Sequence, residues 1–269
     1  MTDISAFFHT IRLPAMPEAA QALIRTLDRE DASASRVRAI IEKDSALSAT
    51  LLRMANSALF GLSQRVSSLD AAINLVGMSQ IRNHAIMVCL RNTFPVAPGL
   101  DRQAFWQGCV SNAAYGHWLA GHAGLDPQTA WLSALLLRLG ELILAQKDAS
   151  AIEAIERLPC RPGERWAREK MLTGYDEGQI SAELGRRWDF PPEMVQALDE
   201  ASAPLQASEL SRLAAVVHLA ALMADSTAIG TRLLDALPAD VLTALQLDLA
   251  GLEAGLPDVR GLLDIAEMD

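Results

Sequence analysis

Arg138 and Glu141 are the charged residues of an otherwise largely apolar stretch, residues 133–145, which reads SALLLRLGELILA. Its apolar positions recur at helical spacing, and both sides of the helix are small or apolar. This pattern predicts a buried helix over 127–145. A charged side chain in such a helix must be paired, because burying an unpaired charge costs a great deal of free energy. The sequence therefore predicts a partner for Arg138 inside the fold.

Residue types that carry common catalytic chemistry are sparse. The chain has five histidines and three cysteines, without CxxC spacing, a P-loop, a GxGxxG motif or a Ser or Cys nucleophile motif. His117 and His122 would point about 140° apart on a helix, too far to share an ion without distortion. His218 lies beside an apolar stripe and is interpreted as a hydrogen-bonded core residue. No catalytic residue, metal ligand or cofactor is predicted, and the sequence does not describe an enzyme.

Composition limits the class of partner. The 269 residues are 51% hydrophobic and 5% aromatic, with a net charge of −10. Such an acidic chain disfavours nucleic acid or an anionic membrane as the main partner. The N-terminus lacks the basic region of a signal peptide, and no apolar stretch suits a membrane span, so we expect a cytoplasmic protein. Three basic groups are interpreted as solvated faces: Arg36 with Arg38, Arg82 with Arg91, and Arg161 with Arg165 and Arg168.

Helix caps and helix breaks recur along the whole chain, and no strand pattern is present. Asp44 and the Asp126-Pro127 pair are typical helix starts, Ser67 with Asp70 suggests a capping box, and Gly77 suggests a helix end. The stretch 92–101, NTFPVAPGLD, has two prolines and a glycine and predicts a junction between two lobes. Helices are expected at about 17–27, 33–42, 45–56, 67–77, 79–90, 101–122, 127–145, 149–158, 164–173, 176–188, 191–201 and 208–225. The fold class is all-α.

Three stretches resemble one known family. They are the LPxxP opening with the blocks EKDSALSATLLRMANSALFG and VSSLDAAINLVG; the helix AFWQGCVSNAAYGHWLA; and GYDEGQISAELGRRWDFPPEMVQAL. Together they resemble the HDOD domain, whose members are helical bacterial modules related to HD-type metal phosphohydrolases. The resemblance implies an HDOD domain over 1–225, with an N-lobe at about 13–92, an HD-like helical lobe at about 100–225, and a short helical appendage at 226–269.

The resemblance also implies that the metal site of HD hydrolases is lost. Such a site needs converging imidazoles and carboxylates that hold the ion and activate water. Aligned by the family pattern, its ligand positions fall on Gly108, Leu137, Arg138, Glu177 and Ala221, with a His-His pair near 201–202. Of these, Glu177 alone could still be a ligand, and an arginine in the place of a metal-binding aspartate repels a cation.

From this alignment we predict that Arg138 pairs with Glu177, an ion pair in the place of the ion. Glu141 and Asp176 are second choices of partner. One alternative is that Arg138 extends along apolar surface to solvent. Another is that Arg138, with Arg186 or Arg187, holds a phosphate-bearing ligand.

The resemblance implies a signalling function by protein–protein contact, with one or more separate signalling proteins as partners. A small-molecule ligand remains possible, and a nucleotide second messenger and a cryptic metal phosphohydrolase are the alternatives. Asn56 lies at a helix end and is interpreted first as a structural residue that bonds backbone groups. The alternative is a partner-binding edge made of Asn56, Leu59 and Phe60.

Overall fold

Every element that the structure describes is a helix. It is a computed structural model that describes residues 4–9, 11, 13–27, 33–57, 65–96, 100–157 and 160–259, and no strand occurs among them. The all-α fold class is confirmed. The described residues form two compact units, one made from residues 14–95 and the other from residues 4–13 with 96–259.

The unit of residues 14–95 is built around one long helix. This helix, α6 (Met78–Thr93), contacts the four others of the unit. They are α2 (Glu18–Ile24), α3 (Ala34–Ile41), α4 (Ser45–Ala55) and α5 (Leu69–Val76). Buried apolar side chains from all five helices form its core, for example Leu23, Ile41, Leu51, Ala72 and Ile86.

The expected helix starts and ends of this unit are set by local chemistry. Oδ1 of Asp44 accepts hydrogen bonds from two backbone N–H groups of α4, as expected for an N-cap. Gly77 ends α5 with φ of 102°, a conformation that favours glycine. The prediction of Ser67 as a cap was wrong: Ser68 caps α5, since its side chain accepts from the N–H of Ala71.

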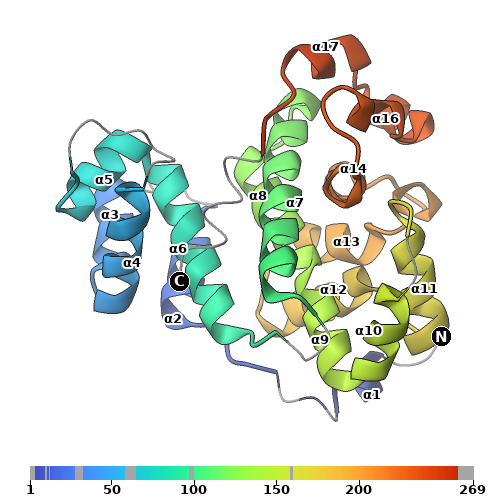
Figure 1. Cartoon of the computed structure of the whole chain (residues 1–269), viewed down its shortest axis with the longest axis horizontal. Coiled ribbons are helices and arrows are strands. Elements are labelled where there is room, and N and C mark those ends of the chain that lie inside the picture. Colours follow the sequence, from blue (N-terminus) through green and yellow to red (C-terminus); the bar gives the residue numbers. More distant parts are fainter. Residues whose placement is uncertain are drawn as a thin grey trace. The chain divides into compact units, whose positions relative to one another are not determined.

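The second unit contains the long helix α7 (Arg102–Ala123) and the helices that pack around its neighbour α8 (Pro127–Leu137). Figure 1 shows α7 and α8 side by side, and α8 also contacts α12, α13 and α14. The remaining helices are α1 (Ile4–Phe8), α9 (Leu139–Lys147), α10 (Ala149–Glu156), α11 (Glu164–Thr173), α12 (Glu177–Arg187), α13 (Pro192–Glu200), the 3₁₀ turn η2 (Pro204–Gln206), α14 (Arg212–Asp225), α15 (Arg232–Asp235), α16 (Ala239–Leu245) and α17 (Leu249–Ala254).

The predicted helix over 127–145 is buried but interrupted. α8 ends at Leu137 and α9 begins at Leu139, with Arg138 between them. The hydroxyl of Ser181 on α12 lies 2.8 Å from the carbonyl oxygens of both Leu136 and Leu137, and it accepts from the N–H of Gly140 at 2.8 Å. A side chain inserted into the helical hydrogen-bond ladder breaks it. Arg138 therefore sits at a bend in the core.

Gly140 allows α9 to approach the start of α12. A Cβ at this position would lie 2.0 Å from the backbone oxygen of Glu177, so only glycine fits without a backbone shift. Among the described residues, the stretch Pro127–Lys147 is the one helical segment apolar and long enough to cross a membrane, but 83% of its apolar window is buried inside the fold. Such burial is typical of a core helix of a soluble protein.

Candidate functional site

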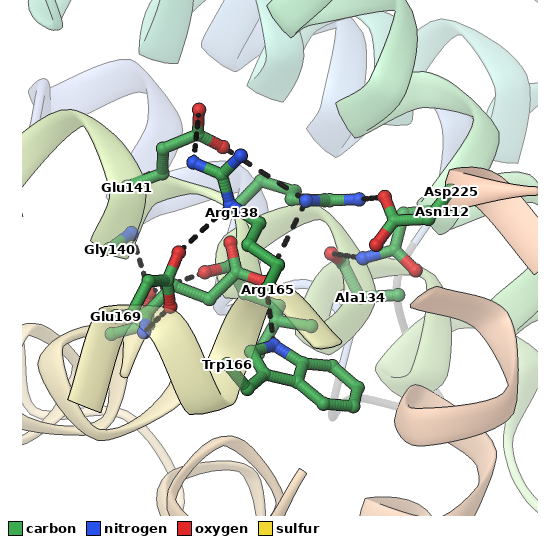
Figure 2. A network of polar contacts seen from close by, with 12 residues as sticks. Asn112, Ala134, Arg138, Gly140, Glu141, Arg165, Trp166, Glu169 and Asp225 are labelled. Atoms are coloured by element: carbon green, nitrogen blue, oxygen red, sulfur yellow. Dashed lines mark hydrogen bonds and ion pairs between the residues drawn. The ribbon is translucent and has the colours of Figure 1, made fainter. Parts of the chain in front are cut away.

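Arg138 lies among three carboxylates. Its side chain is 8% exposed, and one Nη2–H group donates a hydrogen bond to Oδ1 of Asp225, the last residue of α14. Nη1 lies 3.7 Å from Oε1 of Glu177 and 4.0 Å from Oε2 of Glu141. Figure 2 shows Arg138 reaching toward Asp225 from the bend between α8 and α9. The guanidinium is thus held by ion pairs inside the unit and does not extend to solvent.

Glu177 is positioned by the start of α12. Asp176 caps this helix in a capping box with Gln179, and the N–H of Glu177 donates to Oε2 of Glu169 at 2.7 Å. Trp166 donates its indole N–H to Oε1 of Glu177 at 2.9 Å. The structure therefore brings Arg138 and the selected partner Glu177 within ion-pair distance, while the hydrogen bond of Arg138 goes to Asp225.

A second guanidinium stands beside Arg138. Arg165 on α11 is 14% exposed; its Nε–H donates to Oε1 of Glu169 at 2.9 Å, and Nη2 lies 2.9 Å from Oε1 of Glu141. Its Nη1–H group donates to Oε1 of Glu156. Figure 2 shows Arg165 next to Glu141 and Glu169. Seven side chains thus form a charge cluster: Arg138, Glu141, Glu156, Arg165, Glu169, Glu177 and Asp225.

Burial changes the proton affinities in the charge cluster. Desolvation raises the pKa of Glu141 above its usual value, against the opposing effect of Arg165 and Arg138. Desolvation and the nearby Glu177 raise the pKa of Glu169 well above its usual value. In both cases loss of hydration disfavours the charged carboxylate. Glu141 and Glu169 therefore hold protons more strongly than free carboxylates do.

A cavity of about 400 Å³ opens beside the charge cluster. We call it the Arg138 cavity. It is lined by Leu100, Asp101, Ala104, Phe105, Gly108, Arg138, Glu141, Glu156, Arg165, Ala224 and Asp225. All of these come from the second unit, and none of the five histidines, which all lie in the described part, lines it.

The residues that the family resemblance aligns with the HD metal ligands offer few donors to a metal ion. Gly108 lines the Arg138 cavity without a side chain, although a Cβ there would meet no atom within 4 Å. Leu137 and Ala221 are fully buried apolar side chains, and Arg138 brings a positive charge to the place of a ligand. Across the described residues, no group of three or more His, Cys, Asp or Glu side chains could hold a metal ion. Of the aligned residues, Glu177 is the one that keeps a donor side chain.

The other proposed partners of Arg138 lie in different places. Glu141 contacts it only at 4.0 Å, and Asp176 instead accepts a hydrogen bond from Gln179 N–H and pairs with Lys170 Nζ at 2.8 Å. Arg186 pairs with Asp199 at 3.0 Å, and Arg187 pairs with Glu183 at 2.9 Å. Neither arginine lines the Arg138 cavity, so the structure does not gather them with Arg138 around one ligand site.

His218 is half-buried and packs beside Trp166. Its Nδ1 lies 2.8 Å from the carbonyl oxygen of Ala201, and its ring lies 5.2 Å from the ring of Trp166. Desolvation lowers the pKa of His218 below its usual value. This is the hydrogen-bonded core role expected for it.

Asn56 has a structural role in the first unit. Its Nδ2 donates to the carbonyl oxygens of Leu52 and Val66 at 2.7 Å each, and its Oδ1 accepts from the N–H of Val66 at 2.7 Å. The amide thus ties the end of α4 to the segment before α5. Leu59 and Phe60, the other members of the proposed partner-binding edge, lie outside the described residues.

A second cavity, of about 480 Å³, lies in the first unit among α2, α4 and α6. Its cysteine, Cys89, is 7% exposed, and burial raises the pKa of its thiol to about 11. Such a thiol is not a nucleophile near neutral pH. This cavity shows no convergent charged groups comparable to those of the Arg138 cavity.

Two members of the basic groups that we interpreted as solvated faces are buried, and a third lies in the charge cluster. Arg82 and Arg91 are 4% and 8% exposed, and Arg82 donates to the carbonyl oxygen of Thr26 at 3.4 Å. Arg165 is surrounded by three carboxylates. The interpretation was wrong for these residues: Arg82 and Arg91 are buried, and Arg82 and Arg165 have partners from distant parts of the sequence or from other helices. Of these partners, Glu169 alone could be expected from the sequence, because it lies four residues after Arg165 on the same helix and the two side chains face each other.

Comparison with known proteins identifies the family. The sequence model of the HDOD domain matches residues 13–204. A curated but uncharacterized protein of Treponema pallidum is 22% identical over 194 residues, which are 69% of this chain and 37% of that protein. The chain therefore spans about a third of the length of this relative.

Solved structures share the fold over nearly the whole chain. A protein of Shewanella amazonensis named "Putative phosphohydrolase" is 27% identical, with a TM-score of 0.74, and covers 95% of this chain and 94% of its own. An HDOD domain protein of unknown function from Geobacter sulfurreducens is 18% identical, with a TM-score of 0.76 and coverages of 98% and 96%. A protein of Marinobacter aquaeolei named "Putative signal transduction protein" is 22% identical, with a TM-score of 0.79 and coverages of 98% and 63%.

Proposed function

The chain belongs to the HDOD family, and from that premise we propose that it is a non-catalytic signal-transduction module that acts by contact with separate signalling proteins. One observation carries the proposal: the guanidinium of Arg138 is hydrogen-bonded to Asp225 and lies within 4.0 Å of Glu177 and Glu141. Glu177 and Glu141, the two buried carboxylates near Arg138, thus face a fixed cation of the chain itself in place of a metal ion.

The rival function is metal-dependent phosphoester hydrolysis, and the Shewanella amazonensis protein described above is named "Putative phosphohydrolase". Such hydrolysis needs a metal that polarises the phosphoryl group and lowers the pKa of a bound water. Here the position that matches the first histidine is Gly108, and the position that matches the metal-binding aspartate is Arg138. A positive side chain in that place opposes metal binding, which favours the non-catalytic proposal.

Nucleic acid and membrane surfaces are not proposed as partners. The net charge of the chain is −10, and a protein that binds phosphate backbones or anionic lipids gains most of its affinity from basic residues. A phosphate-bearing second messenger is a weaker candidate as a ligand, because carboxylates outnumber guanidinium groups in the lining of the Arg138 cavity. We therefore propose separate proteins as the output partners.

An enzyme assay tests the non-catalytic part. The purified full chain is incubated with bis(p-nitrophenyl) phosphate and p-nitrophenyl phosphate in the presence of Mn²⁺, Mg²⁺ or Ni²⁺. We expect no release of nitrophenolate above that of the metal alone. The matched variant is Glu141→Gln, which removes a carboxylate of the charge cluster. Release by the unmodified chain that disappears in Glu141→Gln would overturn the proposal.

A binding experiment tests the signalling part. The tagged full chain is used to capture proteins from a lysate of its source organism, and each captured protein is purified and mixed with the chain again. We expect at least one to form a complex of defined stoichiometry in size-exclusion chromatography with light scattering. If no captured protein forms such a complex, contact with a separate protein is not the mode of action.

A further inference from the structure

We propose that the Arg138 cavity binds a small aliphatic amine, with the ammonium group held by cavity carboxylates and the methylene chain against the apolar wall. This inference rests on the non-catalytic function proposed above and names its input as a small organic cation. It concerns a ligand of the cavity, whereas the output partner of the module is a protein.

The charge of the cavity favours a cation. Four carboxylates line it, those of Asp101, Glu141, Glu156 and Asp225, against two guanidinium groups, those of Arg138 and Arg165. Its net charge is therefore −2 when all six groups are ionised. Such an excess of one sign attracts ligands of the other sign, and the low dielectric of a cavity strengthens the attraction.

The two arginines are not available to an anion. Arg165 has a carboxylate at each of its three nitrogens: Glu169 at Nε, Glu156 at Nη1 and Glu141 at Nη2. Arg138 donates from Nη2 to Asp225, and its Nη1 lies 3.7 Å from Glu177 and 4.0 Å from Glu141. A phosphate group that approached either guanidinium would therefore also meet the carboxylates around it, which repel an anion.

Carboxylate oxygens, in contrast, are free to accept. Asp101 uses Oδ1 to accept from the N–H of Ala104, Glu156 uses Oε1 for Arg165, and Asp225 uses Oδ1 for Arg138. No hydrogen bond among the described residues reaches the second oxygen of any of these three carboxylates. Glu156 and Asp225 are 43% and 24% exposed, so a ligand can reach them from solvent. An ammonium group with three N–H donors suits such a set of acceptors.

The rest of the cavity wall is apolar. Leu100, Ala104, Phe105 and Ala224 line it together with the charged side chains. A volume of about 400 Å³ lies in the range of small-molecule sites and exceeds what a single metal ion needs. The ring of Phe105 adds a surface that attracts cations. An aliphatic chain with an amino group at one or both ends matches this lining, because its amino group can contact the carboxylates and its methylene groups can contact the apolar side chains.

Isothermal titration calorimetry of the full chain with 1,4-diaminobutane tests the proposal. We expect one saturable site per chain, with affinity that falls as salt is added. Affinity should rise between about pH 5.5 and about pH 8, because the raised pKa of Glu141 makes protons compete with the amine at the lower pH. Butanol and sodium phosphate are the ligand controls, and we expect no saturable binding of either.

Variants locate the site without endangering the fold. Glu156→Gln changes a partly exposed side chain, and Asp101→Asn keeps a residue that can cap α7. Each should weaken 1,4-diaminobutane binding by about ten- to hundredfold, the loss expected for one charge-assisted contact. Glu253→Gln on α17 is the matched control, since Glu253 is exposed and does not line the cavity, and it should leave affinity unchanged.

Three results would overturn the proposal: no saturable binding of the diamine at millimolar concentration, equal affinity in Glu156→Gln, Asp101→Asn and the unmodified chain, or saturable phosphate binding that displaces the diamine. These outcomes are separate from failure of the proposed function. Phosphoester hydrolysis dependent on Glu141 would refute the non-catalytic function, whereas loss of amine binding alone leaves the protein–protein function standing.

Discussion

The substitution Arg138→Met tests whether the charge cluster depends on its central cation. Methionine keeps an unbranched apolar side chain, as long as the aliphatic stem of arginine, but removes the guanidinium. It leaves Glu177 and Glu141, which are 1% and 7% exposed, without this cation. Breaking a buried ion pair by removing one partner costs about 3–5 kcal/mol. Because Asp225 is 24% exposed and can be rehydrated, we expect the lower end of this range, about 3 kcal/mol.

The assay is urea unfolding followed by circular dichroism, with thermal unfolding as a second readout. A loss of about 3 kcal/mol corresponds to a fall in Tm of about 6–12 °C for a chain of this size. The matched control is Arg186→Met, because Arg186 is 43% exposed and its ion pair with Asp199 lies at the surface. Exposed pairs contribute at most about 1 kcal/mol.

The effect of Arg138→Met should also depend on pH. Arg165 and Arg138 both lower the pKa of Glu141, so loss of Arg138 raises the folded-state pKa of Glu141 further above its unfolded value. The folded variant then binds more protons than the unfolded chain, and its stability falls as pH rises through the folded pKa. We expect a larger loss at about pH 8 than at about pH 5. A loss equal to that of Arg186→Met at both pH values would refute the buried role of Arg138.

Three further predictions concern the residues around the cluster. Gly140→Ala should lower the free energy of unfolding by about 3 kcal/mol, because its Cβ would lie 2.0 Å from a backbone oxygen. Gly121→Ala should raise the free energy of unfolding by about 0.5–1 kcal/mol, because its Cβ would meet nothing within 4 Å. Chemical unfolding of both variants checks the opposite signs. Asp225→Asn should cost about 1–3 kcal/mol by the same measurement, and Asp199→Asn, at an exposed ion pair, less than about 1 kcal/mol; equal losses would contradict the hydrogen bond to Arg138. Burial raises the folded-state pKa of Glu169 well above its usual value, so the stability that its bound proton contributes is lost as pH rises through that pKa. Glu169→Gln should therefore flatten the dependence of the unfolding free energy on pH between about 5 and 8. An unchanged slope would show that Glu169 is not the proton-binding group.

Most of the fold could be predicted from sequence because its signals are local. Asp44 and Asp126 cap helices through bonds to backbone groups two or three residues away. The break at Arg138 could not be predicted in this way. It depends on the hydroxyl of Ser181, which comes more than forty residues later in the sequence and lies within hydrogen-bond distance of the carbonyl oxygens of Leu136 and Leu137.

The candidate site was only partly predictable for the same reason. The apolar surroundings of Arg138 showed that a buried partner was needed, and the family pattern selected Glu177. The sequence did not indicate Asp225 as a partner. Asp225 is at the end of α14, and its contact with Arg138 depends on how α14 packs against α8. Arg165 stands in a polar helix that looks solvated in sequence, although it is 14% exposed in the fold.

Binding of Mn²⁺ tests most directly whether Arg138 has replaced a metal ion. The purified full chain is titrated with Mn²⁺, and the free ion is followed by electron paramagnetic resonance. We predict that the free Mn²⁺ signal rises in proportion to the Mn²⁺ added, as in buffer alone. A stoichiometric Mn²⁺ site that is lost in Glu141→Gln would contradict this, because it would show that the charge cluster still binds a divalent cation.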